Sequence, residues 1–166
     1  MNGNEKTVID LPDTPPQMIL LIGIPGSGKS TFAATNFPTR YVKISRDVLR
    51  TRAREARVLA EALDQLRDII IDNTNVKRIE RERFILPAKA AGYRVTGFYF
   101  RSVIKDCLGR NAQRSGSARI PVAGVIARAK DLEIPSLEEG FDELFYVVIT
   151  DAGFSVKTWS SDYEEK

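Results

Sequence analysis

The feature that most constrains this chain is a glycine-rich loop between an apolar segment and a helix-like segment. The apolar run Met18–Ile22 leads into the loop, and Gly23, Gly28, Lys29 and Ser30 fill the fixed positions of G-x-x-x-x-G-K-[ST]. Glycine lets the backbone curl so that successive N–H groups point at phosphate oxygens, and a following helix adds its positive dipole end. A chance glycine-rich turn is the alternative, but the strand and helix on either side favour a nucleoside triphosphate site.

We expect this loop to bind ATP through eight residues: Gly23, Pro25, Gly26, Ser27, Gly28, Lys29, Ser30 and Thr31. Lys29 would bridge the β- and γ-phosphates, and the Ser30 hydroxyl would bind Mg²⁺. ATP and Mg²⁺ are therefore the expected cofactors.

The composition limits the chemistry that can follow. The chain of 166 residues has no histidine, which excludes histidine-based nucleophilic and phosphohistidine chemistry, so a general base must be a carboxylate. Its one cysteine, Cys107, lies at helical spacing with apolar residues and indicates a core thiol in a chain without an internal disulfide. No apolar run has membrane-spanning length, so we expect a cytoplasmic protein that binds no membrane. The net charge of +3, carried mostly by arginine, weakly favours a polyanionic partner.

Strand-like and helix-like patterns alternate along the chain. The expected strands are 18–22, 41–44, 68–72, 94–100 and 144–149, and the expected helices between and after them include 29–36, 76–91 and 122–131. This order predicts an α/β fold of the P-loop kinase type: a parallel sheet of about five strands with helices on both faces and an arginine-bearing lid. We expect one kinase domain over residues 18–159, a flexible lead-in over residues 1–17 in which Val8-Ile9 could add an edge strand, and a solvated tail over residues 160–166.

Helix limits follow from turn and cap residues. Ser45 is expected to cap one long helix with a buried stripe and, on a neighbouring face, a basic stripe. The expected buried residues are Leu49, Ala53, Ala56, Ala60 and Leu63, and the basic ones are Arg46, Arg50, Arg54 and Arg57. We expect 73–75 to cap the next helix, Gly92 to close it after Pro87, and Ser102 to cap the helix that carries Cys107.

The first candidate for a group that acts on the acceptor of the phosphate follows the second expected strand. Asp47 and Arg50 are three residues apart at a helix start, so both side chains lie on adjoining parts of one face. The carboxylate could accept a proton from an attacking hydroxyl while the arginine, with Arg46 nearby, holds a phosphate of the acceptor. The alternative is an acid that only complements the helix dipole and pairs with Arg50.

The second candidate follows the third strand. An acid at the end of a central buried strand is where P-loop proteins place a Mg²⁺-directed carboxylate, and Asp72 occupies that position. Asn73 and the residues after it also turn the chain, which is compatible with a role in the site. Whether Asp72 or Asn73 contacts substrate or a metal-bound water is left open.

The third candidate is the polar segment from Arg110 to Pro121. Phosphoryl transfer requires mainly positive charge at the equatorial oxygens of the transferring group, and a flexible lid with Arg110, Arg114 and Arg119 could supply it while excluding water. A solvated surface loop is the alternative.

These motifs together resemble the kinase module of 5′-polynucleotide kinases, both the phage type and the repair type. The segments that carry the resemblance, in the order of the family, are 23–31, Ser45-Arg46-Asp47, Asp72-Asn73-Thr74-Asn75, 110–121 and Leu137-Glu138-Glu139-Gly140-Phe141. The resemblance covers roughly residues 18–150. It implies ATP-dependent phosphorylation of the 5′-hydroxyl of a DNA or RNA end.

The resemblance also implies roles for single residues. Asp47 would be the general base, Arg50 would contact the 3′-phosphate of the acceptor, and Arg114 would be the lid arginine on the transferring phosphate. The phage form has Asp at the position of Asn73, and the lid here is one residue longer than the phage pattern.

Other functions stay open at this point. Many polynucleotide kinases also carry a 3′-phosphatase with a D-x-D nucleophile, and because no D-x-D occurs here we expect no phosphatase activity. A small-metabolite or antibiotic kinase would share the loop and the carboxylate base, although the D-x-D of shikimate-type kinases is absent. A non-catalytic nucleotide-binding module would need neither Asp47 nor an arginine lid. The oligomeric state is not indicated.

Overall fold

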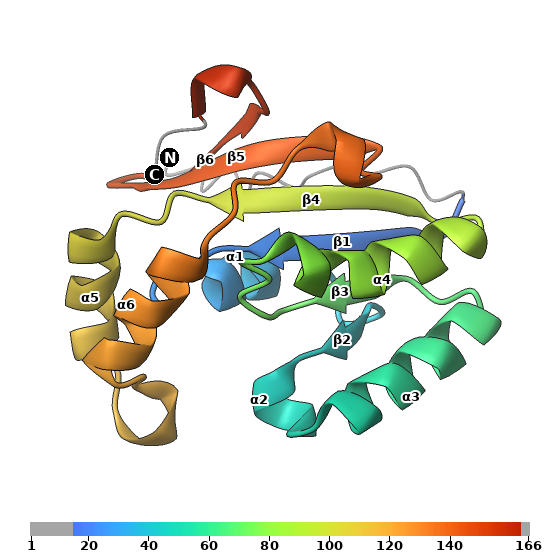
Figure 1. Ribbon diagram of the computed structural model, residues 1–166, viewed down its shortest axis with the longest axis horizontal. Helices are drawn as coiled ribbons and strands as arrows, with labels where there is room; N and C mark the ends of the chain where they lie inside the picture. Colours follow the sequence, from blue (N-terminus) through green and yellow to red (C-terminus); the bar gives the residue numbers. More distant parts are fainter. Residues whose placement is uncertain (1–14, 164–166) are drawn as a thin grey trace, which may run out of the picture.

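A computed structural model gives the structure of the chain and describes residues 15–163 (Figure 1). One six-stranded sheet has the order β2-β3-β1-β4-β5-β6, with parallel pairing throughout except for β6, which is antiparallel to β5. The strands are β1 (Gln17–Ile22), β2 (Val42–Ile44), β3 (Ile69–Ile71), β4 (Arg94–Phe100), β5 (Glu143–Thr150) and β6 (Gly153–Thr158). The predicted α/β class and its parallel sheet are confirmed, whereas β6 was not predicted.

Six α-helices accompany this sheet in the part of the chain that the structure describes. They are α1 (Lys29–Asn36), α2 (Arg46–Leu49), α3 (Arg52–Asp64), α4 (Arg78–Ala90), α5 (Ile104–Ala112) and α6 (Val122–Asp131). Three short 3₁₀ turns are η1 (Gly116–Ala118), η2 (Leu137–Glu139) and η3 (Ser161–Tyr163). Tyr163 of η3 stacks on Tyr146 with ring centroids 4.3 Å apart. The expectations for residues 1–14 and 164–166 lie outside the described residues.

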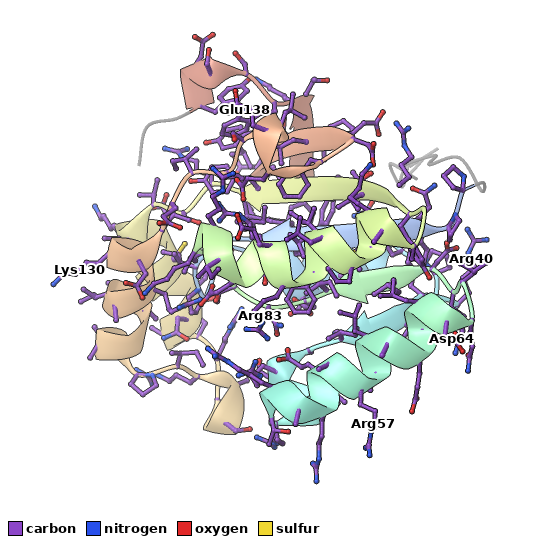
Figure 2. The ribbon with its side chains drawn as sticks, turned by 45° about the vertical axis from the view of Figure 1, so that its right-hand side comes forward. Arg40, Arg57, Asp64, Arg83, Lys130 and Glu138 are labelled. Carbon is purple, nitrogen blue, oxygen red and sulfur yellow. The ribbon has the colours of Figure 1, made fainter. Side chains whose placement is uncertain are left out.

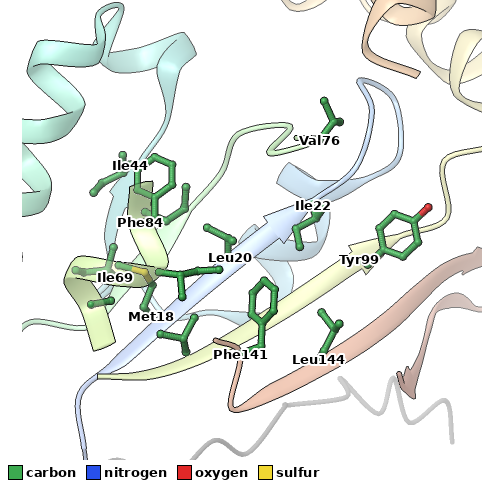
Figure 3. Close-up of a cluster of buried hydrophobic side chains, with 14 of the residues drawn as sticks. Met18, Leu20, Ile22, Ile44, Ile69, Val76, Phe84, Tyr99, Phe141 and Leu144 are labelled. Atoms are coloured by element: carbon green, nitrogen blue, oxygen red, sulfur yellow. The ribbon is translucent and has the colours of Figure 1, made fainter. Parts of the chain in front are cut away.

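The central strand β1 explains why the sheet has layers on both sides. All six of its residues are buried, and β1 pairs with β3 on one side and β4 on the other. Met18, Leu20 and Ile22 face the larger core, which α3 and α4 cover and which Figure 3 shows in close-up. Ile19 and Leu21 face a smaller core closed by α1. Parallel strands buried on both faces have this continuous apolar character.

Aromatic rings fill the smaller core around one residue of α1. The ring of Phe32 lies 5.2 Å, centroid to centroid, from each of Phe98, Phe100 and Phe154. Tilted and edge-on contacts of this kind add to the hydrophobic stabilisation. The helix that follows the glycine-rich loop is thereby fixed against β4 and β6.

The expected long helix after β2 is wrong in its length and in its buried face. It breaks after Leu49, where Arg50 takes a left-handed φ of 72°, and a new helix begins with Thr51 accepting a hydrogen bond from the Arg54 N–H (3.2 Å). The residues buried on α3 are Glu55, Leu59 and Ala62. Because the break rotates α3 relative to α2, the expected alanine stripe is exposed and the four arginines do not form one stripe.

Two expected helix caps are also wrong. The Ser102 hydroxyl does not cap α5; it accepts from the Ile24 N–H (3.2 Å) and donates to the Phe100 carbonyl (2.8 Å), so it supports the glycine-rich loop instead. The helix after β3 begins at Arg78, where the carboxylate of Glu80 accepts from the Lys77 N–H (3.2 Å). Ser45 does occupy the N-cap position of α2, although its side chain makes no capping hydrogen bond.

The topology brings the candidate segments to one edge of the sheet. The carboxyl ends of β1, β2 and β3 lie next to one another because these strands are parallel neighbours. In Figure 1, α2 lies below this edge and the pair α5–α6 stands to its left. The segments after β1, β2 and β3 therefore share one region, as the sequence predicts.

A buried ion pair joins α4 to the turn before β5. The fully buried guanidinium of Arg81 donates to both carboxylate oxygens of Glu139 (2.7 and 3.0 Å) and to the carbonyl oxygens of Asn75, Val76 and Glu133. Glu139 also accepts from the Ser136 N–H (2.8 Å). All these donors and acceptors are satisfied, which makes the burial of two charges tolerable.

Replacing Glu139 by Ala should therefore destabilise the protein strongly. The substitution leaves the Arg81 charge buried without its partner, so we expect the free energy of unfolding to fall by about 3–5 kcal/mol. Urea unfolding followed by circular dichroism measures this. The control is Glu82→Ala, which breaks an exposed i,i+4 pair with Arg78 and should cost about 1 kcal/mol or less. Equal losses in the two variants would contradict the role given to the buried pair.

Candidate active site

The glycine-rich loop is curled and is held by hydrogen bonds from outside itself. Gly26 and Gly28 have φ angles of 86° and 98°, which side-chain-bearing residues rarely adopt. The Gly23 N–H donates to the Thr74 carbonyl (2.9 Å), and Arg110 Nε donates to the Gly26 carbonyl (2.5 Å). A Cβ at Gly26 would lie 2.4 Å from the carbonyl oxygen of Cys107, so no other residue fits there.

Lys29 and Ser30 begin α1 at the mouth of this loop. The Lys29 ammonium is buried and donates to the Ile24 carbonyl (3.1 Å) and Ser27 Oγ (3.4 Å). Burial lowers the pKa of Lys29 to about 8, against the opposing attraction of Asp72. A bound phosphate would supply the negative charge that this ammonium lacks.

The Ser30 hydroxyl and the Asp72 carboxylate form the candidate metal site. Ser30 Oγ donates to Asp72 Oδ2 (2.9 Å), and Lys43 Nζ lies 3.1 Å from the same oxygen. Hydroxyl and carboxylate oxygens are the ligands that Mg²⁺ prefers, and this ion keeps several waters and binds substrate phosphates as well. The donor set therefore fits Mg²⁺. The described residues contain no cluster of three or more Cys, Asp or Glu side chains that would form an all-protein metal cage.

Asp47 lies on α2 across the same cavity. The cavity has a volume of about 400 Å³, and its lining includes nine of the predicted site residues: Pro25, Gly26, Lys29, Ser30, Arg46, Asp47, Asp72, Asn73 and Arg114. Asp47 is exposed, and among residues 15–163 its carboxylate makes no hydrogen bond or ion pair. The pair with Arg50, which was the alternative interpretation of Asp47, is absent there. Arg50, predicted to bind the acceptor, leaves the helix with positive φ and does not line the cavity. An acceptor hydroxyl could therefore reach the Asp47 carboxylate.

A buried carboxylate that sequence reasoning missed lies beneath this wall of the cavity. Glu55 is fully buried in the first turn of α3, and it accepts from Arg46 Nε (2.7 Å) and from the Asn73 side-chain amide (2.7 Å). Asn73 Oδ1 in turn accepts from the Arg46 N–H (2.7 Å). The three side chains tie the start of α2, beside Asp47, to the segment beside Asp72. In the sequence Glu55 is one of several acids in a charged helix, and only the rotation of α3 turns its side chain inward.

The segment between α5 and α6 contributes only part of the expected set of arginines. Arg114 lines the cavity, whereas Arg119 is exposed outside it and Arg110 holds the Gly26 carbonyl. The buried Asn111 side chain accepts from the Ile120 N–H (2.9 Å) and donates to the Ile120 carbonyl (2.7 Å), so the two ends of this segment are joined. The first residues of the predicted lid segment, 110–112, belong to α5, so only 113–121 connects the two helices.

A second network that the sequence did not indicate also lines the cavity. Arg128 of α6 donates to Thr74 Oγ1 (2.6 Å) and to both oxygens of Glu80 (2.7 and 2.9 Å). Burial would raise the pKa of Glu80, but the hydrogen bonds from Arg128 and the Lys77 backbone outweigh it and hold this pKa below its usual value. Arg52 and Arg83 also line the cavity and were not predicted. Their helices carry many arginines, and only the packing of α3 and α4 selects these two.

The fold and the loop together define a P-loop α/β domain, in which a central parallel strand leads into a glycine-rich loop at a cavity with charged walls. A family model described as AAA domain matches residues 18–132, and the chain belongs to this family, AAA_33.

Two curated relatives of this chain have names that include a polynucleotide kinase. The chain is 26% identical over 152 residues to the bifunctional polynucleotide phosphatase/kinase of Schizosaccharomyces pombe, covering 89% of this chain and 37% of that protein. It is 30% identical over 139 residues to a provisionally named bifunctional polynucleotide phosphatase/kinase of Acanthamoeba polyphaga mimivirus, covering 77% and 32%. The chain thus spans about a third of the length of the curated relatives it matches. The resemblance to polynucleotide kinases indicated by the motifs is confirmed.

Among solved structures, the Pnkp1/Rnl/Hen1 RNA repair complex contains a chain with the same fold. The TM-score is 0.58 at 22% identity, over 70% of this chain and 44% of that one. At this identity the likeness shows the fold alone. Within residues 15–163, none of the helices has the length and apolar character needed to cross a membrane.

The lowered pKa of Lys29 makes ATP binding a proton-linked event. In the free protein Lys29 loses its proton as the pH rises through about 8, and bound phosphates should restore the charged form. Proton uptake on binding should therefore grow from about pH 7 and approach one proton near pH 9. Calorimetry in two buffers of different ionisation enthalpy measures it, with Lys29→Met as the control that removes the titrating group. Equal uptake by both proteins at the higher pH would contradict this assignment.

Proposed function

We propose that this chain transfers the γ-phosphate of ATP to the 5′-hydroxyl of a polynucleotide end. The observation that carries the proposal is the position of Asp47, whose carboxylate has no hydrogen-bond or ion-pair partner among residues 15–163 and lines the same cavity as Lys29 and Ser30. A base and a donor site that share one cavity suit attack by an alcohol on a terminal phosphate.

In the proposed reaction the 5′-oxygen forms a bond to the γ-phosphorus while the bond from that phosphorus to the bridging oxygen of ADP breaks. The proton of the hydroxyl passes to the Asp47 carboxylate. Lys29 and Arg114 would stabilise the negative charge on the oxygens of the transferring group. Enzymes that transfer phosphoryl groups lower the reaction barrier mainly by stabilising this charge. When bound, Mg²⁺ would add further positive charge to the phosphates. Ser30 and Asp72 would hold it.

The charge of the cavity supports a polyanionic acceptor. Six basic side chains line it against three acidic ones: Lys29, Arg46, Arg52, Arg83, Arg114 and Arg128 against Asp47, Asp72 and Glu80. ATP with Mg²⁺ carries only part of the negative charge needed to balance this surplus. The names of the curated relatives support a nucleic-acid end over a small neutral alcohol.

We assign the kinase activity alone to this chain, because no D-x-D pattern occurs in its 166 residues. A cytoplasmic site of action fits the proposed use of ATP as the phosphoryl donor.

The direct test is transfer of labelled γ-phosphate to a panel of 5′-hydroxyl oligonucleotides and small alcohols. We expect label on the oligonucleotides, and Asp47→Asn should reduce the rate by about 10²–10⁴-fold because it removes the base while ATP still binds. Asp64→Asn, an exposed acid on α3 away from the cavity, is the matched control and should keep the wild-type rate. Near-normal turnover of Asp47→Asn would remove it as the base, and label on small alcohols alone would replace the polynucleotide acceptor.

Arg114 and Arg119 should differ although both belong to the segment between α5 and α6. Arg114→Ala removes a cation that faces the cavity, so kcat should fall by about 10²–10³-fold with a much smaller change in the Kd for ATP. Arg119→Ala should lose less than tenfold, since Arg119 lies outside the cavity. Single-turnover kinetics and nucleotide titration measure the two quantities. Parallel losses of rate and affinity would make Arg114 a nucleotide-binding residue.

A further inference from the structure

The carboxylate of the candidate metal site is paired with a lysine that the proposed reaction does not use. Lys43 Nζ lies 3.1 Å from Asp72 Oδ2, the same oxygen atom that accepts the hydrogen bond from Ser30 Oγ (2.9 Å). The Asp72 side chain is 5% exposed, whereas that of Lys43 is 49% exposed. Since Ser30 and Asp72 are the side chains that would hold Mg²⁺, a fixed positive charge lies beside the place where a cation would bind.

The sheet explains how Lys43 reaches Asp72. Val42 and Ile44 pack into the larger core, so Lys43 between them points to the opposite face, which α1 covers. Its register partner on β3 is Ile70, and Asp72 follows on the same face two residues later. The Asp72 N–H donates to the Ile44 carbonyl (2.8 Å), which fixes Asp72 beside β2. Among the described residues Lys43 is not one that lines the cavity, so it acts on the metal site from outside it.

The charges around the metal site do not favour a free divalent cation. Asp72 also attracts the buried ammonium of Lys29, so one carboxylate faces two ammonium groups. The other acidic side chains of the described cavity lining are Asp47, on α2, and Glu80, which is bound to Arg128. Cations repel each other over such short distances, and partial burial weakens the screening by water. A triphosphate supplies the negative charge that these side chains lack.

We infer that Lys43 makes metal binding depend on the nucleotide, because its charge lowers the affinity of the site for a free divalent cation but not for the anionic triphosphate. This inference rests on the phosphate and metal sites of the proposed function, and it is independent of the acceptor. The protein would take up the metal together with ATP and release it together with ADP. Mg²⁺ is commonly bound through substrate phosphates, which fits a site of this kind.

The test measures the binding of Mn²⁺ alone and of ATP alone, without an acceptor. Mn²⁺ is the probe because its electron paramagnetic resonance signal reports the free ion. Lys43→Met removes the charge and keeps the length of the side chain, so Mn²⁺ should bind about 3–10-fold more tightly than to wild type; half-exposed charges are screened, which limits the gain. ATP in EDTA, followed by calorimetry, should bind no more tightly than to wild type and up to about fivefold more weakly.

Two variants serve as controls. Lys130→Met removes an exposed lysine on the outer side of α6, outside the described cavity lining, so both affinities should equal those of wild type (Figure 2). Lys43→Arg keeps the positive charge on a long side chain and should stay within about twofold of wild type for both ligands. Tighter Mn²⁺ binding by Lys43→Met alone, without tighter ATP binding, supports the inference.

The inference is overturned if Lys43→Met binds Mn²⁺ no more tightly than wild type, if it binds both ligands more tightly, or if Lys43→Arg behaves as Lys43→Met does. The proposed function fails separately, when the wild type transfers no phosphate to any polynucleotide, and that result leaves both binding measurements unaffected. If transfer occurs and Lys43→Met binds Mn²⁺ and ATP as Lys130→Met does, only the role of Lys43 is wrong.

Discussion

The whole site depends on the short segment after β3, in which the side chain of Asn73 connects α2 to α3. Asn73 accepts from the Arg46 N–H and donates to the buried Glu55, so it fixes the start of α2, where Asp47 lies. The residues on either side reach the glycine-rich loop: Asp72 accepts from Ser30, and the Thr74 carbonyl accepts from the Gly23 N–H. One turn of chain therefore sets the position of the donor loop and of the proposed base relative to each other. Parallel pairing of β2, β3 and β1 makes this possible, since it brings the three strand ends to one edge.

The side chains of the site fall into two groups, which differ in burial and in how far their charges are neutralised. Lys29 is buried with a lowered pKa, and Glu55 is buried with its oxygens satisfied, so these groups are fixed before any ligand arrives. Asp47, Arg52 and Arg83 are exposed to the cavity and, in the part of the chain that the structure describes, have few or no partners. Preorganised groups lower the cost of binding a triphosphate, and uncommitted ones are free to meet an acceptor. The arrangement suits a reaction between two anionic substrates.

The sequence was sufficient for the fold class and for the side chains that adjoin strand ends. The apolar run before Gly23 and the acids after β2 and β3 can be located from local pattern and parallel topology, and the structure brings Lys29, Asp47 and Asp72 to one cavity. The predictions for the site that failed depended on how α3 is rotated relative to α2. A single left-handed residue, Arg50, ends α2 and turns α3, and no pattern in the sequence marks an arginine for that conformation. Glu55, Arg52 and Arg83 reach the site only through that rotation and the packing of α4. Strand β6 was missed because Phe154 and Val156 are the only large apolar side chains among its six residues, and so short a pattern does not identify a strand.

The central claim is that Asp47 and the glycine-rich loop act on the two ends of one phosphoryl transfer. A crystal structure with a non-hydrolysable ATP analogue, Mg²⁺ and a short 5′-hydroxyl oligonucleotide tests it most directly. The account predicts the 5′-oxygen within about 2.6–3.2 Å of an Asp47 carboxylate oxygen and in line with the γ-phosphorus. A 5′-oxygen bound elsewhere in the cavity, with Asp47 facing solvent, would contradict it.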